Sequence, residues 1–178
     1  MAQSRPLPID PLAEAKRQWL AHGWTDAADG MTAVISVMRA QQLLLARVDT
    51  SLKPFGLSFA RFEVLRLLAF SRSGSLPLSS VVARLQVHAT TVTSTAERLM
   101  RDGLITREPH PHDGRAAMLA LTEAGRELVE RATTAINAEV FAAPGVTQTD
   151  AADLVAIVAR LRKDAGDFTE PRPQPDPL

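Results

Sequence analysis

Hydrophobic residues recur at intervals of three and four over most of the chain, and this spacing predicts a largely α-helical protein. The most informative stretch is a helix expected over about His88 to Asp102. Its buried stripe would consist of Val92, Thr95, Ala96, Leu99 and Met100. Its opposite face carries the polar residues Thr90, Thr91, Ser94, Arg98 and Arg101. A face of hydroxyl and guanidinium groups without a large apolar side chain suits a DNA groove.

A shorter helix is expected just before this one. The residues expected to face its core are Val81, Val82 and Leu85. Ser79 or Ser80 is expected to cap it, and residues 86–88 leave room for only a brief turn into the next helix. Gly103 follows the second helix where a left-handed residue stops a helix. Two helices joined by so short a turn predict a helix-turn-helix, whose second helix can enter the major groove.

Extended segments follow the helix-turn-helix. Leu104–Glu108 and Arg115–Leu121 both have the composition of β-strands. The residues between them contain two prolines and the pair Asp113-Gly114, which predicts a hairpin with its tip near that pair. Upstream, Leu76–Leu78 is expected to form a short strand that pairs with this hairpin. Together these strands predict a wing.

Amphipathic helices are expected on both sides of this centre, over about 12–22, 29–53, 59–71 and 123–141, with a last helix that opens at a capping pair formed by Thr147 and Asp150. The helix over 59–71 is apolar almost all round and is therefore expected to form the core. The two C-terminal helices carry more apolar surface than a wing covers, so we expect a second subunit to cover it in an isologous dimer.

The motifs after the helix-turn-helix occur in the order Asp102-Gly103-Leu104-Ile105-x-Arg107, Asp113-x-Arg115 and Leu121-Thr122-x-x-Gly125. This order resembles the winged-helix core of the multiple-antibiotic-resistance regulator (MarR) family, over about residues 31–165. The resemblance implies a homodimeric transcription regulator, usually a repressor, whose DNA affinity is altered by a small ligand. It also implies that Arg115 reaches the minor groove from the wing while Asp113 supports the tip. Gly114 departs from the basic residue often found there, which would weaken the wing's contact with phosphate.

We therefore expect a mainly α fold with a small β-hairpin wing, organised as one domain over residues 12–165. The winged helix-turn-helix core would span about 57–122, and dimerisation helices about 29–53 and 123–165. Residues 1–11, with three prolines, are expected to be mobile, and residues 169–178, with four, to be disordered. A two-fold dimer places its recognition helices about 34–36 Å apart, which predicts a pseudo-palindromic operator on double-stranded DNA.

The residues predicted to contact DNA are Ser79, Ser80, His88, Thr90, Thr91, Thr93, Ser94, Arg98 and Arg115. Ser79, Ser80 and Thr90 are placed for phosphates. Thr93, Ser94 and Arg98 are the candidates for base edges, and an Arg98 fork on a guanine would contribute roughly 1–3 kcal/mol of discrimination. The alternative for each of these residues is a solvated surface position.

An effector pocket is predicted from two regions of the chain. Its candidate residues are Arg39, Gln42, Phe59, Phe62 and Arg66. The phenylalanines would form an apolar floor, and the Arg66 guanidinium would anchor a carboxylate or phosphate. An aromatic compound, an organic acid and an acyl thioester are all compatible with such a pocket. The alternatives are that the phenylalanines are ordinary core and that Arg66 forms a salt bridge to a neighbouring helix.

Composition limits the possible functions. The chain has 178 residues and no net charge, with 20 basic and 20 acidic residues. Between Leu76 and Ala117 five arginines stand against four carboxylates, so non-specific DNA affinity should be modest. No cysteine is present, which excludes disulfides and thiol redox sensing. Residues 1–30 hold no leader-like apolar segment, and no run of about 18 apolar residues occurs, so we expect a cytoplasmic protein without membrane contact.

Parts of the sequence are also compatible with two other classes of function. A metal-responsive regulator is suggested by His110, His112 and Asp113, although no fourth ligand lies nearby in the sequence. A helical protein-interaction module would explain the apolar helices but not the polar face followed by a wing. An enzyme is not expected, because the chain has no nucleophile elbow, glycine-rich phosphate loop or cysteine nucleophile, and no cofactor is predicted.

Overall fold

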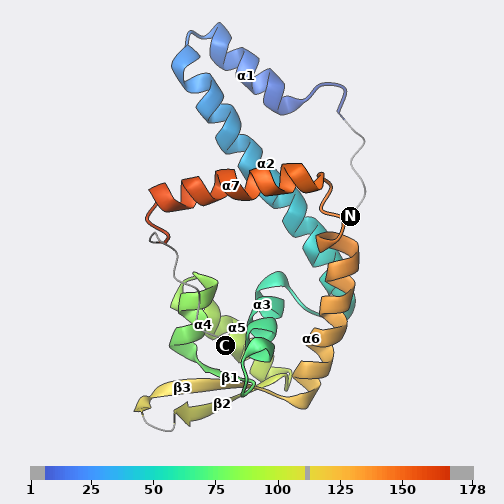
Figure 1. Cartoon of the computed structure of the whole chain (residues 1–178), viewed down its shortest axis with the longest axis vertical. Coiled ribbons are helices and arrows are strands. Elements are labelled where there is room, and N and C mark those ends of the chain that lie inside the picture. The colour runs from blue at the N-terminus through green and yellow to red at the C-terminus, as the bar shows by residue number, and fades with distance from the viewer. Residues whose placement is uncertain (1–6, 111–112, 169–178) are drawn as a thin grey trace. The chain divides into compact units, whose positions relative to one another are not determined.

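The structure is a computed structural model that describes residues 7–110 and 113–168. In this part of the chain the protein is mainly helical with one three-stranded antiparallel sheet, which confirms the predicted fold class (Figure 1). The chain forms two compact units, the first ending at Arg47 and the second beginning at Val48.

The first unit holds helix α1 (Pro11–Ala21) and most of helix α2 (Thr25–Leu52). The carboxylate of Asp10 caps α1 by accepting the N–H of Leu12 at 3.0 Å. Proline suits the first helical position because it has no N–H to satisfy there. Pro11 therefore belongs to α1, and the mobile segment predicted over 1–11 is too long at this end. Residues 1–6 of that segment lie outside the described residues.

Helix α2 begins at Thr25, earlier than the predicted Asp29. The chain turns sharply at Gly23, whose φ is 79°, and the N–H of Trp24 donates to the carbonyl of Trp19 at 3.0 Å, so that α2 starts directly after this turn. Much of the apolar surface of α2 in the first unit is exposed, at Val34, Val37, Met38, Leu43, Leu44 and Leu45. Val34, Met38 and Leu45 are spaced as one apolar stripe, whereas Val37, Leu43 and Leu44 widen the exposed apolar surface beyond it.

The second unit follows the end of α2. Its elements are a 3₁₀ turn η1 (Lys53–Phe55), α3 (Phe59–Phe70), β1 (Ser75–Pro77), α4 (Leu78–Leu85), α5 (Ala89–Arg101), β2 (Ile105–His110), β3 (Asp113–Leu121), α6 (Glu123–Ile136), a π-helical turn η2 (Asn137–Phe141) and α7 (Gln148–Asp164).

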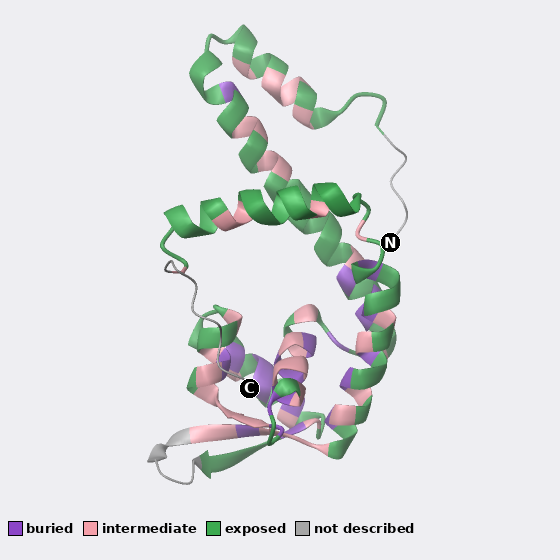
Figure 2. Ribbon diagram, viewed as in Figure 1, coloured by how far each residue is buried: buried purple, intermediate pink, exposed green. Residues whose placement is uncertain are grey.

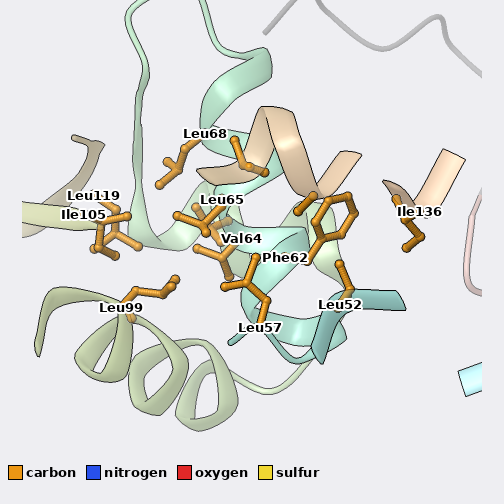
Figure 3. Packing of buried hydrophobic residues seen from close by; sticks show 14 of the residues in the cluster. Leu52, Leu57, Phe62, Val64, Leu65, Leu68, Leu99, Ile105, Leu119 and Ile136 are labelled. Atoms are coloured by element: carbon orange, nitrogen blue, oxygen red, sulfur yellow. The ribbon is translucent and has the colours of Figure 1, made fainter. Parts of the chain in front are cut away.

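Helix α3 is the centre of the second unit, as its sequence predicts. Its Ser58 cap accepts the N–H of Arg61 at 3.4 Å. The helix contacts α4, α5, α6 and the sheet. Figure 3 shows buried side chains of α3 packed among those of the neighbouring elements, and Figure 2 colours the buried residues of the ribbon purple. Phe70 departs from the expectation of a core residue: it is 61% exposed, and the Arg66 guanidinium lies over its ring at 4.8 Å from the centroid.

The sheet has the strand order β1-β3-β2, and both pairings are antiparallel. Strand β1 pairs with β3 as predicted, with Leu76 opposite Leu119. The hairpin tip lies earlier than predicted. His110 is opposite Asp113 in the register, so Asp113 and Gly114 already belong to strand β3. The predicted tip at Asp113-Gly114 is therefore wrong, and residues 111–112 lie outside the described residues.

Two helices complete the unit. Thr122 caps α6 and Thr147 caps α7, and the latter forms the predicted capping box with Asp150. The helix predicted over 123–141 is α-helical only as far as Ile136. It then widens into η2, where Ala142 N–H donates to Asn137 at 2.8 Å across five residues. Helix α7 leaves apolar side chains exposed at Leu154, Val155, Ile157 and Leu161. The tail predicted over 169–178 lies outside the described residues.

Candidate nucleic-acid interface

Helix α5 presents a polar surface because its other face is buried. The inward side chains are Val92, Thr95, Ala96 and Leu99. They pack toward α3 and β2, and burying a valine or leucine contributes about 1.5–3 kcal/mol. Thr90, Thr91, Ser94, Arg98 and Arg101, which the periodicity assigns to the outer face, are all exposed, as are Ala89 and Glu97. The rotation of α5 about its axis is therefore fixed by its buried stripe.

Helix α4 and the turn after it place the other helix-turn-helix candidates. Ser79 is exposed and Ser80 half-buried, and both lie inside the first turn of α4. The prediction that one of them caps the helix is wrong. Because the helix starts immediately after strand β1, its N-cap is Pro77. Proline has no side-chain acceptor that could cap the helix. His88 is the exposed N-cap of α5, and its carbonyl accepts the N–H groups of Thr91 and Val92 at 2.9 and 3.2 Å.

Two of the base-edge candidates already hydrogen-bond within α5. The hydroxyl of Thr93 donates to the carbonyl of Ala89 at 2.9 Å, and that of Ser94 donates to the carbonyl of Thr91 at 3.1 Å. Thr93 is half-buried, at the border of the polar face. Each hydroxyl keeps its acceptor lone pairs, so either could still accept a hydrogen bond. Arg98 is the longest of the three candidates and is exposed.

The wing residues are placed only through their backbone. Asp113 and Arg115 belong to strand β3, but their side chains lie outside the described residues. The same holds for the side chain of His110, and His112 is outside altogether. No group of three potential metal ligands occurs among the side chains that the structure describes.

A contact that was not predicted from the sequence holds the end of α5. Arg61 of α3 forms an ion pair with Asp102, the C-cap of α5, and donates to the carbonyl of Gly56 at 2.9 Å. A hollow beside this ion pair is lined by Asp49, Lys53, Gly56, Leu57, Ser58, Arg61 and Arg98. Its three basic residues against one carboxylate extend the positive character of α5 toward η1. No local sequence signal connects Arg61 with Asp102, which lies 41 residues away.

The junction of α5, the wing and α6 is held by Thr122. Its hydroxyl donates to the carbonyl of Gly103 at 2.9 Å and accepts the N–H of Gly125 at 3.1 Å. Its own N–H donates to the carbonyl of Leu104 at 3.1 Å. Gly103 has the left-handed φ of 71° that its position predicts. The residues that end the recognition helix are thereby joined to the first turn of α6.

The candidate effector residues fall into separate groups. Arg39 donates to Gln42 at 3.2 Å on the exposed surface of α2 in the first unit. In the second unit Phe62 is buried, and half-buried Phe59 stacks on it with ring centroids 6.5 Å apart. Phe62 belongs to the core cluster and Phe59 packs against it, as the alternative interpretation holds.

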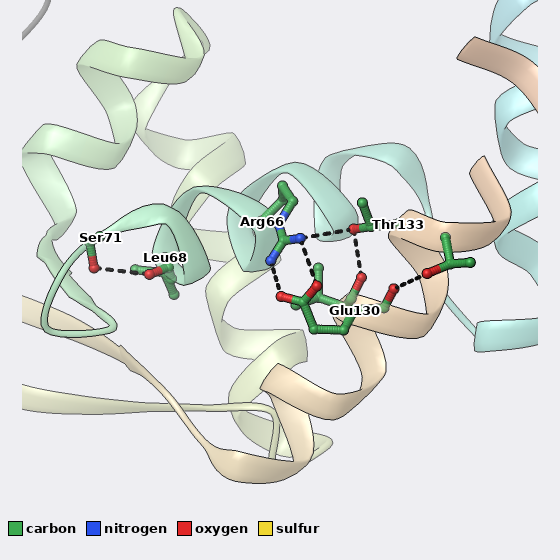
Figure 4. Close-up of polar contacts among 7 residues, drawn as sticks. Arg66, Leu68, Ser71, Glu130 and Thr133 are labelled. Carbon is green, nitrogen blue, oxygen red and sulfur yellow. Dashed lines mark hydrogen bonds and ion pairs between the residues drawn. The ribbon is translucent and has the colours of Figure 1, made fainter. Parts of the chain in front are cut away.

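Arg66 has partners inside the protein. It forms an ion pair with Glu130 of α6 and donates to the hydroxyl of Thr133 at 3.2 Å (Figure 4). The hydrogen bond from Arg66 lowers the pKa of the Glu130 carboxyl below its ordinary value. The predicted alternative of a salt bridge to a neighbouring helix is therefore observed, and the carboxylate that Arg66 binds in this structure is Glu130.

A helix-turn-helix whose second helix turns a polar face outward, followed by a two-stranded wing, defines the winged helix-turn-helix class. No helix in the described part of the chain has the length and apolar character needed to cross a bilayer.

Comparison with known proteins narrows this class to a family. Residues 55–116 match the family model described as MarR family. The chain is 32% identical over 123 residues to the uncharacterised HTH-type transcriptional regulator YhbI of Bacillus subtilis (strain 168), covering 69% of this chain and 75% of that protein. The crystal structure of Sco5413, a MarR family transcriptional regulator from Streptomyces coelicolor, superposes with a TM-score of 0.72 at 45% identity, covering 80% of this chain and 99% of that one.

The chain belongs to the MarR family of transcriptional regulators, which confirms the resemblance read from its motifs. Its relatives are regulators and not enzymes, as expected. A further structural neighbour, Sco3205 from Streptomyces coelicolor, was solved in complex with DNA. It superposes with a TM-score of 0.68 at 22% identity, covering 84% of this chain and 94% of that one, and so supports the fold.

Proposed function

We propose that this protein is a sequence-specific DNA-binding regulator that acts as a homodimer on a pseudo-palindromic operator. The observation that carries the proposal is the outward polar face of α5, held by a buried stripe on a winged-helix scaffold. Helix α5 enters the major groove, where Arg98 donates its fork to a base edge. Ser79, Ser80, His88, Thr90 and Thr91 lie within reach of the flanking phosphates, and Thr93 and Ser94 line the groove.

The wing contributes Arg115 to the minor groove, with Asp113 supporting the hairpin. Because the whole chain carries no net charge, the protein does not bind DNA through overall attraction. Affinity depends on a few arginine side chains at the proposed interface, so the salt dependence of binding should be shallow. Specificity should therefore respond more strongly than in a basic protein to the loss of a single arginine.

Dimer formation is supported by the apolar surfaces that the chain leaves uncovered. Helix α7 exposes Leu154, Val155, Ile157 and Leu161, and α2 exposes a separate apolar set in the first unit. Surfaces of this kind on a soluble chain mark contacts with another protein. A second copy covers them most simply, through an isologous interface that also sets the spacing of the two recognition helices.

Repression relieved by a small effector is the form of regulation we propose. An effector can change operator affinity only if it binds more tightly to one spacing of the two recognition helices than to the other. The candidate residues remain Arg39 and Gln42 in the first unit and Phe59, Phe62 and Arg66 in the second. Since Arg66 already binds Glu130, a carboxylate effector at this position would have to replace that side chain.

The test is fluorescence anisotropy of the purified protein on labelled DNA fragments that flank its own gene, at several salt concentrations. We expect saturable binding to one fragment. The variant Arg98→Ala should lose about 1–3 kcal/mol of discrimination against altered sites. The variant Arg115→Ala should weaken binding and reduce the slope of log affinity against log salt. Arg131→Ala, which alters an exposed arginine of α6, is the matched control and should bind like the wild type.

Equal and weak binding to every fragment, unchanged by Arg98→Ala and Arg115→Ala, would refute the proposed interface. An effector screen then uses the same assay, with aromatic acids and acyl thioesters added to the operator complex. Release of the operator by one compound at a saturable concentration supports ligand-responsive repression. Release that persists unchanged in Arg66→Met would remove Arg66 from the proposed effector site.

A further inference from the structure

Residue Gln86 in the turn of the helix-turn-helix is conformationally unusual. It is the C-cap of α4 and has a φ of 53°, the single positive value among the non-glycine residues that the structure describes. A residue with a Cβ rarely adopts this left-handed conformation without support from its surroundings. Because α5 begins three residues later, the conformation of Gln86 sets the direction in which the recognition helix starts.

The support comes from the C-terminal end of α7. The guanidinium of Arg162 donates to the side-chain oxygen of Gln86 at 3.2 Å, and the side-chain nitrogen of Gln86 donates to the carbonyl of Asp167 at 3.4 Å. Both functional atoms of the Gln86 amide are thus engaged by residues more than 70 positions away in the sequence. We call these three residues the turn–α7 contact.

The end of α7 is shaped to make this contact. Arg162 forms an ion pair with the carboxylate of Asp167, and its guanidinium lies 5.5 Å from the centre of the Phe168 ring. Gly166, at a φ of 74°, reverses the chain after α7, and the N–H of Asp167 donates back to the carbonyl of Arg162 at 2.9 Å. This reversal orients Arg162 and presents the Asp167 carbonyl to the turn.

We propose that Gln86 and Arg162 are positioning residues, which join the C-terminal end of α7 to the turn before the recognition helix and so restrain the direction of α5. Neither residue needs to touch DNA for this role. The inference rests on the proposed function, since α7 belongs to the proposed dimer interface and α5 to the proposed DNA interface. The turn–α7 contact is then the polar link by which a change at the dimer interface reaches the recognition helix.

The first experiment needs no DNA. Hydrogen exchange, followed by mass spectrometry of the peptide that covers residues 86–92, is compared among the wild type, Arg162→Ala, Gln86→Asn and Arg160→Ala. Asparagine tolerates the left-handed conformation but is too short to reach Arg162, so this variant should fold. We expect faster exchange in Arg162→Ala and Gln86→Asn. Arg160→Ala, which alters an exposed arginine of the same helix, should leave exchange unchanged.

The second experiment measures operator affinity in the same variants and in the double variant that combines Gln86→Asn with Arg162→Ala. Loss of an exposed hydrogen-bonded contact should weaken binding about three- to fivefold. The double variant should be no weaker than either single one, and the salt slope should stay at its wild-type value. The exchanged pair Gln86→Arg with Arg162→Gln should restore binding, because it keeps one guanidinium and one amide in contact.

Other results would overturn the proposal. Unchanged exchange in Arg162→Ala would show that α7 does not support the turn. Losses that multiply in the double variant, or a reduced salt slope in Arg162→Ala alone, would make Arg162 a direct phosphate ligand instead. Failure of the wild type to bind any fragment would refute the proposed function, whereas the exchange experiment would still decide whether the contact holds the turn.

Discussion

Gly125 offers the sharpest test of how the recognition helix is held. It lies in the first turn of α6 against Leu104, the residue that precedes strand β2. A Cβ built at this position would overlap the carbonyl oxygen of Leu104, and would lie 3.0 Å from its carbonyl carbon and 2.9 Å from Cδ1 of Leu121. The oxygen and the carbon are backbone atoms that cannot rotate away. The substitution Gly125→Ala therefore requires α6 and the start of β2 to separate.

This separation lowers the free energy of unfolding through the contacts that it disturbs. Overpacking a tight site costs typically 1–3 kcal/mol. The movement also lengthens two hydrogen bonds of Thr122, to the carbonyls of Leu104 and Gly103, each worth about 1 kcal/mol. Against this, alanine is favoured over glycine inside a helix by roughly 1 kcal/mol. The expected net loss is about 2–4 kcal/mol of the free energy of unfolding.

The assay is urea unfolding followed by circular dichroism at one fixed protein concentration, because a dimer's apparent stability depends on concentration. Gly30→Ala is the matched control. Gly30 lies inside α2, and a Cβ there meets nothing within 4 Å, so this variant should gain about 0.5–1 kcal/mol from helix propensity. If Gly125→Ala were as stable as Gly30→Ala, the close approach of α6 to Leu104 would be refuted.

Three further predictions concern stability. Glu130→Gln removes the charged partner of Arg66 and should lower the free energy of unfolding by about 0.5–1 kcal/mol at pH 7. Because the pKa of Glu130 is lowered in the folded state, this difference from the wild type should vanish as the pH falls through that lowered pKa. A difference that persists at pH 3 would contradict this prediction. Thr147→Ala should lower the free energy of unfolding by about 0.5–2 kcal/mol and return the lowered pKa of Asp150 toward its ordinary value. It should also speed hydrogen exchange at the start of α7, and unaltered exchange there would argue against the capping box. Leu99→Ala should cost about 2–5 kcal/mol by thermal unfolding, and a loss below 1 kcal/mol would mean that α5 is not anchored by its apolar stripe.

Local rules predicted the elements of this fold well. The stripe on α5, the stop at Gly103 and the capping box at Thr147 each depend on residues within one or two turns of one another. Helical periodicity also separates the buried and exposed faces of α5 correctly, since a helix packed on one side must turn its other side outward. These local features are enough to place most of the candidate interface.

Features that depend on distant partners were not predictable in this way. The ion pair between Arg61 and Asp102 and the contact of Gln86 with Arg162 join residues 41 and 76 positions apart. A guanidinium on an apolar helix gives the same sequence signal whether it binds an effector or a neighbouring carboxylate, so Arg66 could not be assigned from sequence. The cap of α4 was misplaced for a related reason. Serines near a helix start look like caps, but here strand β1 ends at Pro77 and leaves no residue between strand and helix.

The family motif Leu-Thr-x-x-Gly acquires a physical meaning from the Thr122 junction. Thr122 caps α6, yet its hydroxyl also donates to the carbonyl of Gly103, and Gly125 lets the helix approach the backbone of the next residue, Leu104, without a side chain between them. The motif therefore stabilises the joint between α5 and α6, a role that needs no contact with DNA. With Arg61 on the C-cap and Arg162 beside the turn, both ends of α5 are tied to helices outside the helix-turn-helix. A recognition helix fixed at both ends can change its direction only when α3, α6 or α7 moves. Under the proposed function, an effector that moves α3, α6 or α7 would release the operator without contacting α5.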